Sequence, residues 1–125
     1  MEQKICLDTD ICIEIVKNSQ VGRNIINSAP GGEALISSIT VFELYLRETN
    51  LDKVNSLLDK FNVLPFDGNT AKIASGISKS LKKSGFLIEI RDIFIAATCI
   101  GNKCSLATLN KKHFERIKGL EILDV

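Results

Sequence analysis

The chain has 125 residues, a length that suits one folded domain and leaves little room for two. Apolar residues make up 45% and charged residues 25%, as in an ordinary globular protein, and the net charge of +1 excludes nucleic-acid binding through bulk charge alone. No apolar run has the length of a signal peptide or a membrane span, so we expect a cytoplasmic protein with no membrane partner.

Short apolar runs alternate with amphipathic ones along the first half of the chain. Thr9 or Asp10 is expected to cap the first helix. The predicted elements are a strand at 5–7, a helix to about residue 17, a helix at 20–28 ended by Pro30-Gly31-Gly32, a strand at 34–37 and a helix from residue 38 onward.

The second half of the chain continues this alternation. Pro65 indicates that its strand lies at an edge or an end of the sheet. The predicted elements are a helix capped by Asn50, a strand at 63–66, a long helix after 67–69 that Gly85 ends, an apolar helix from 89–92 to Gly101, a strand at 105–108, a helical turn at 110–114 and a strand at 121–125.

The order of these elements predicts the fold class. Strands and helices alternate, and the connections are long enough to carry helical crossovers between parallel strands. We therefore expect an α/β protein, a three-layer α/β/α sandwich with a mainly parallel central sheet, formed by residues 1–125 as a single domain.

The four cysteines form no CxxC pair, and the chain has one histidine, so no structural zinc site is indicated. All four lie within or beside apolar runs, which is typical of small buried side chains, and their oxidation state is left open. They are Cys6, Cys12, Cys99 and Cys104.

Three carboxylates stand out because each lies in apolar sequence near a strand-to-helix junction. Asp8 closes the first strand, Glu43 lies on the helix after the second, and Asp92 lies in the first turn of the most apolar helix. Buried carboxylates repel one another and raise each other's pKa unless they are paired or bind a cation. Hard oxygen ligands suit Mg²⁺ or Mn²⁺.

Each of these acids also has a purely structural interpretation. Asp8 is placed to cap the first helix, Asp92 complements a helix dipole, and Glu43 suits a solvated helix surface. The metal-site hypothesis depends on all three converging at one edge of the sheet, where ligands of open α/β folds bind.

Four sequence blocks in this order resemble the PIN-domain ribonucleases, and among them the VapC toxins of prokaryotic toxin–antitoxin pairs. The first is an apolar strand followed by Asp-Thr, and the second has a Ser-x-x-Thr-x-x-Glu-Leu form. The third is an Asp-x-x-Ile-Ala-Ala helix, and the fourth a Thr-x-Asn segment. They correspond to residues 5–10, 36–44, 91–98 and 106–114.

By this resemblance Asp8, Glu43 and Asp92 are the catalytic, metal-binding acids, with Mg²⁺ or Mn²⁺ as the cofactor. Asn110 stands where many members have a fourth acid, so it offers a weaker, neutral metal ligand. His113 stands where relatives often carry another aspartate, and we expect it to be partly exposed at the border of the site.

Hydroxyls near the acids are expected to orient them. Thr9, Ser37 and Thr108 take this part by the resemblance. Asp10 is ambiguous, since it suits both a helix cap and an outer ligand of the metal.

The activity implied is that of an endoribonuclease, in which a metal-activated water attacks a phosphodiester bond of RNA. Arg91, Lys111 and Lys112 are the basic residues best placed to contact phosphates, whereas Arg116 and Lys118 are assigned to solvated surface. One tyrosine and no tryptophan are present, so base stacking on aromatic side chains is not indicated.

The resemblance also implies a homodimer and a cognate VapB-type antitoxin. Val41, Leu44, Tyr45 and Leu46 leave little of the Glu43 helix polar, which suits an interface on part of that surface as well as burial in the core, the commoner fate of such residues.

Two other functions remain open at this point. The Asp-x-Asp form of residues 8–10 is similar to the start of haloacid-dehalogenase-type phosphatases, although the residues that follow differ. Asn110 also suits a catalytically weak PIN-like binding module.

Overall fold

The computed structural model describes residues 3–28 and 33–123, and five parallel strands form its central sheet. The strands lie in the order β3-β2-β1-β4-β5, so the first strand of the chain is the central one. Their bounds are β1 (Lys4–Leu7), β2 (Glu33–Ser37), β3 (Asn62–Leu64), β4 (Ser105–Ala107) and β5 (Ile122–Leu123).

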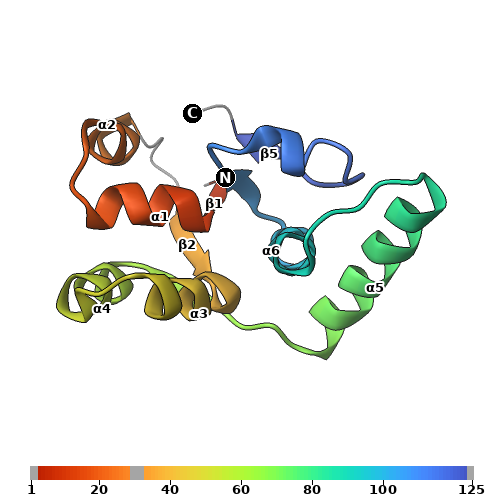
Figure 1. Ribbon diagram of the computed structural model, residues 1–125, viewed down its shortest axis with the longest axis horizontal. Helices are drawn as coiled ribbons and strands as arrows, with labels where there is room; N and C mark the ends of the chain where they lie inside the picture. The colour runs from red at the N-terminus through yellow and green to blue at the C-terminus, as the bar shows by residue number, and fades with distance from the viewer. Residues whose placement is uncertain (1–2, 29–32, 124–125) are drawn as a thin grey trace.

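Helices cover both faces of the sheet, with α1 to α4 on one side and α5 and α6 on the other (Figure 1). They are α1 (Thr9–Val16), α2 (Gln20–Ser28), α3 (Ser38–Arg47), α4 (Leu51–Lys60), α5 (Gly68–Lys83) and α6 (Ile90–Gly101), followed by the 3₁₀ turn η1 (Lys111–His113). The predicted α/β/α sandwich with a parallel sheet is therefore confirmed.

The two apolar cores follow from the alternation of side chains along the strands. In β1, Ile5 and Leu7 pack toward α1, α3 and α4, while Cys6 between them packs toward α5 and α6. In β4, Leu106 packs in the core on the side of α5 and α6, whereas Ala107 packs in the core on the side of α1, α3 and α4. Both faces of the central strands are buried, which is why they read as continuous apolar runs.

The order in which the strands are added to the sheet changes direction at β1. It moves outward from β1 to β2 and β3, then returns through α5 and α6 to place β4 on the other side of β1. The carboxyl ends of β1 and β4 consequently form the switch point at which open α/β sheets bind ligands.

Most helix boundaries agree with the sequence-based expectations. Asn50 caps α4 by accepting the backbone N–H of Lys53, and Gly85, with φ at 78°, follows the last turn of α5. The cap of α1 is Asp8, as its structural interpretation suggested, and the expectation that Thr9 or Asp10 takes this position is wrong. Pro30-Gly31-Gly32 and the end of the last predicted strand lie outside the described residues.

The remaining general expectations concern Pro65, the cysteines and membranes. Pro65 follows β3, which is an edge strand as predicted. All four cysteines are buried, and none forms a disulfide in the part of the chain that the structure describes. Within residues 3–28 and 33–123, no helix combines the length and the apolar character needed to cross a bilayer.

Candidate active site at the carboxyl edge of the sheet

Asp8 lies at the switch point, where β1 ends and α1 begins. Its backbone N–H donates to the carbonyl of Ala107 at 2.9 Å, which holds the ends of β1 and β4 together. The residue is 6% exposed. Oδ1 accepts the backbone N–H of Thr9 at 2.8 Å, and Oδ2 accepts the hydroxyl of Thr108 at 2.7 Å. Asp8 is thus both a helix cap and the buried acid of the sheet edge.

Burial raises the pKa of Asp8 from its ordinary value of 3.8 to about 7. The charges of Asp10 and Asp92 contribute to this rise in pKa, and the hydrogen bonds from Thr108 and Thr9 oppose it only in part. The ionised form of a carboxyl group is unfavourable in this position, and a neighbouring cation stabilises it.

Glu43 reaches the same edge from α3 through a chain of hydroxyls. Ser37 caps α3 by accepting the backbone N–H of Thr40 at 3.1 Å. The buried Thr40 hydroxyl lies 3.0 Å from that of Thr9, and Thr9 Oγ1 donates to Glu43 Oε1 at 2.7 Å. Thr9 therefore connects the helix that Asp8 caps to Glu43, whereas Ser37 reaches Glu43 only through Thr40 and Thr9.

Thr40 is a member of this network that the sequence interpretation did not assign. It is fully buried, and its backbone N–H and hydroxyl both contact Ser37. The available signal was the Ser-x-x-Thr spacing at the start of a helix, which places two hydroxyls within one capping turn.

Asp92 enters from the first turn of α6 and contacts the turn that follows β4. His113 Nδ1 lies 3.1 Å from Asp92 Oδ2 and 2.8 Å from Asn110 Nδ2. Burial raises the pKa of Asp92, the His113 contact opposes this, and the charges of Glu89 and Glu43 add to the rise. Asp92 thus lies in the electrostatic field of Glu43 as well as of Asp8.

Asp10 joins α1 to the segment after β4 and caps no helix. Its Oδ2 accepts the backbone N–H of Leu109 at 3.1 Å and lies 3.4 Å from the Thr108 hydroxyl. Its Oδ1 is buried and makes no hydrogen bond to any residue that the structure describes. Burial raises the pKa of this carboxyl group too.

The basic residues predicted to contact RNA differ in their surroundings. Arg91 lies between two acids, with Nη1 3.5 Å from Glu43 Oε2 and Nε 3.1 Å from Glu89 Oε1. Its charge is therefore shared with carboxylates, which compete with any phosphate. Lys111 is half-buried and Lys112 is exposed on η1.

The chemistry of these donors fits a hard divalent cation. Most of the donors are carboxylate and amide oxygens. The unpartnered Oδ1 of Asp10 and the raised pKa of Asp8 indicate that negative charge buried here is not fully compensated. The donor side chains are, however, not gathered closely around one point. Among the described residues, no three acidic, imidazole or thiol side chains form a group able to hold an ion. Glu43 contacts Arg91 instead, and Asp92 contacts His113.

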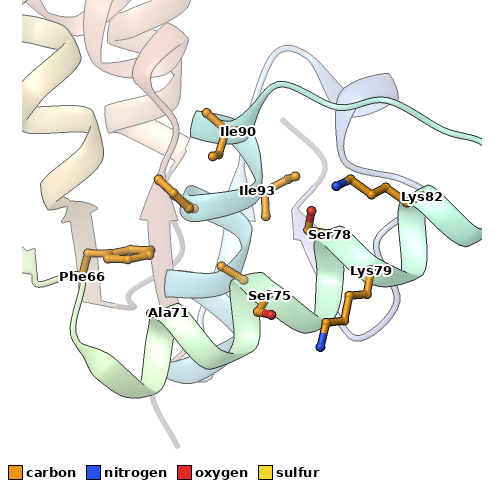
Figure 2. A pocket seen from close by; sticks show the side chains of 10 residues that line it. Phe66, Ala71, Ser75, Ser78, Lys79, Lys82, Ile90 and Ile93 are labelled. Atoms are coloured by element: carbon orange, nitrogen blue, oxygen red, sulfur yellow. The ribbon is translucent and has the colours of Figure 1, made fainter.

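A hollow with a volume of about 450 Å³ lies elsewhere on the surface, between α5 and α6. Figure 2 shows its apolar wall, with Phe66 and Ile93, and the lysines Lys79 and Lys82 on α5. None of the acids described above lines it. The candidate site is therefore defined by its carboxylates and their hydrogen bonds.

Comparisons with known proteins show the family to which the chain belongs. The family described as PIN domain matches residues 5–120. "Ribonuclease VapC1" of Methanocaldococcus jannaschii is 37% identical, over 98% of this chain and 89% of the relative. "tRNA(fMet)-specific endonuclease VapC" of Shigella flexneri is 29% identical over 97% of each.

Among solved structures, DNA-bound VapBC from Salmonella typhimurium matches with a TM-score of 0.87 and 30% identity, over 98% of each chain. The phosphatase alternative raised by the Asp-x-Asp form of residues 8–10 is not supported by any of these similarities. The chain belongs to the PIN-domain family and, within it, to the VapC proteins.

Proposed function

We propose that this chain is a metal-dependent endoribonuclease and the toxin of a VapBC-type toxin–antitoxin pair. The observation that carries the proposal is the buried Asp8 at the β1–β4 switch point, hydrogen-bonded by Thr108 and connected through Thr9 to Glu43. Relatives named as ribonucleases support it.

In this proposal Asp8, Glu43 and Asp92 hold Mg²⁺ or Mn²⁺, and Asn110 offers a neutral amide oxygen. When bound, such an ion lowers the pKa of a water molecule and offsets the charge of the phosphodiester. Thr108 fixes one oxygen of Asp8, and Thr9 fixes one oxygen of Glu43. To reach an ion, Glu43 exchanges its contact with Arg91, and Asp92 exchanges its contact with His113.

The direct test is cleavage of a mixed RNA pool by the purified protein. We expect cleavage with Mg²⁺ or Mn²⁺ and none with EDTA, because the acids alone provide no activated nucleophile. RNA binding without cleavage under every metal condition would identify the binding-module alternative and contradict the proposal. Hydrolysis of a phosphate monoester in place of RNA would also contradict it.

Replacing Thr108 with valine is expected to weaken cleavage about 10- to 100-fold, as for other residues that orient a metal ligand. Valine keeps the shape of threonine but removes the hydroxyl that donates to Asp8 Oδ2. The loss of that buried donor is expected to cost about 1–3 kcal/mol of unfolding free energy. Initial cleavage rates and urea denaturation measure the two effects, with Thr49→Val, at an exposed position, as the control.

A VapB-type antitoxin is the proposed protein partner. The solved relatives whose titles name VapBC complexes support this inference. Coexpression of the chain with the product of a neighbouring small reading frame, followed by affinity purification, tests it. A stable complex that no longer cleaves RNA is the expected result.

We further propose that α3 contributes to a homodimer interface. Leu44 faces the core, but Phe42 is 57%, Tyr45 42% and Leu46 64% exposed. Residues three and four positions apart share one face of a helix, so these three side chains form an apolar patch.

Replacing Phe42 with glutamate is expected to shift the protein from dimer to monomer, because the new charge loses its hydration in the interface. Light scattering after size-exclusion chromatography measures the mass. Val21→Glu, which places the same charge at an exposed apolar position of α2, is the matched control. An unchanged dimer in the Phe42 variant would place the interface on another surface.

A further inference from the structure

A small hollow adjoins the acidic edge, between the segment that precedes α6 and the turn around η1. Its volume is about 160 Å³, roughly half of the ~300 Å³ at which pockets for drug-sized molecules begin. His113 lines it, and His113 Nδ1 lies 3.1 Å from Asp92 Oδ2. The hollow thus has room for a single flat ring, one side chain away from a proposed metal ligand.

Its walls present groups on which a nucleic-acid base can stack. The guanidinium carbon of Arg116 lies 3.5 Å from the centre of the Phe86 ring, and both residues line the hollow. This cation–π contact holds the guanidinium group in place, although Arg116 as a whole is exposed. Bases of single-stranded RNA stack on aromatic rings and on the planes of arginine side chains.

The positive charges around the hollow favour a base that is attached to a phosphate backbone. Arg116 and the exposed Lys112 line it, together with His113. Its one acid, Glu89, accepts the Nε–H of Arg91 at 3.1 Å, so a basic group that it shares with Glu43 offsets part of its charge.

We propose that this hollow is the subsite for one unpaired base of the RNA, beside the bond that is cleaved. The inference rests on the proposed ribonuclease function and adds to it the residues that contact one base of the RNA. The base stacks against Arg116 on Phe86, and Lys112 pairs with a flanking phosphate. Because bases inside a duplex are already stacked on their neighbours, the subsite selects nucleotides in loops or single strands.

The test is binding of a short single-stranded RNA that carries one 2-aminopurine, measured in EDTA so that no cleavage occurs. Stacking quenches the fluorescence of this base. We expect Arg116→Ala to weaken binding about tenfold and to lose the quenching. Arg116→Lys keeps the charge but not the plane, so it is expected to retain the salt dependence and still lose the quenching.

Two further variants separate stacking from charge. Lys112→Ala is expected to lower the slope of log affinity against log salt by about 0.7, the value for one phosphate contact in a single strand. Lys53→Ala on α4 removes the same charge from an exposed position that does not line the hollow, and is expected to leave binding and quenching unchanged.

The proposal is overturned if Arg116→Ala binds and quenches like the parent, or if lysine fully restores quenching. It is also overturned if Arg116→Ala weakens only the capture of the antitoxin, since the hollow would then serve a protein partner. In each of these cases the parent still cleaves RNA, so the ribonuclease function stands. A parent that neither binds nor cleaves RNA removes both proposals together.

Discussion

Replacing Asp8 with asparagine is expected to lower the rate of RNA cleavage about 1,000-fold or more, the largest loss for any single change at this site. Asparagine keeps the size of the side chain and remains a good helix cap, so α1 is expected to form as before. What is lost is the negative charge at the switch point, and with it the principal attraction for a divalent ion.

The same substitution is expected to leave the protein at least as stable as the parent at pH 8. Ionised Asp8 is buried and lies in the field of Asp10 and Asp92, which is why its pKa is raised to about 7. An amide removes both the desolvation cost and the repulsion. A loss of activity combined with a gain of stability is typical of residues kept for function rather than for the fold.

Initial cleavage rates and urea denaturation of the parent and the variant measure these two effects. Asp59→Asn, the same change at an exposed position near the end of α4, is the matched control and should affect neither quantity strongly. If Asp8→Asn protein cleaves RNA at the parental rate, Asp8 holds no catalytic ion and the proposed mechanism is wrong.

The fold was predictable because its determinants are local. The apolar runs of β1, β2 and β4 have both faces buried, and the residues between them repeat at helical spacing. Parallel strands end at a common edge of the sheet, so an acid after β1 and a hydroxyl after the neighbouring β4 are expected to lie close together there. Asp8 and Thr108 do so at 2.7 Å.

The side-chain pairs of the site were less predictable. His113 contacts Asp92, which lies 21 residues earlier in the chain. Arg91 contacts Glu43, which lies on a different helix. Sequence spacing fixes neither contact, because long side chains take the rotamers that their tertiary neighbours allow. The sequence therefore predicts RNA contact for Arg91 and a place at the border of the site for His113, but neither of these two pairings.

Arg116 illustrates the same limit from the other direction. Its sequence context is that of a solvated basic residue, and the low content of tyrosine and tryptophan gave no indication of base stacking. The structure places it on Phe86, thirty positions earlier in the chain. A stacking surface can therefore be built from an arginine and a phenylalanine that share no motif.

Raising the pH from 4 to 7 in the presence of EDTA is expected to destabilise the protein, and Asp8 contributes to this change. Its pKa is 3.8 in the unfolded chain and about 7 in the folded one. Between these values the folded protein keeps a proton that the unfolded chain has released, so stability falls as the pH rises and levels off above about 7. Over the whole interval the contribution of Asp8 is about 4 kcal/mol.

Urea denaturation of the parent and of Asp8→Asn at several pH values isolates this contribution, because every other group is common to both proteins. The parent is expected to lose more stability between pH 4 and 7 than the variant does. Mn²⁺ at pH 8 is expected to return stability to the parent and much less to the variant, since the ion then takes the place of the proton. Equal pH slopes in the two proteins would show that Asp8 ionises without strain, and an equal response to Mn²⁺ would show that the ion binds elsewhere.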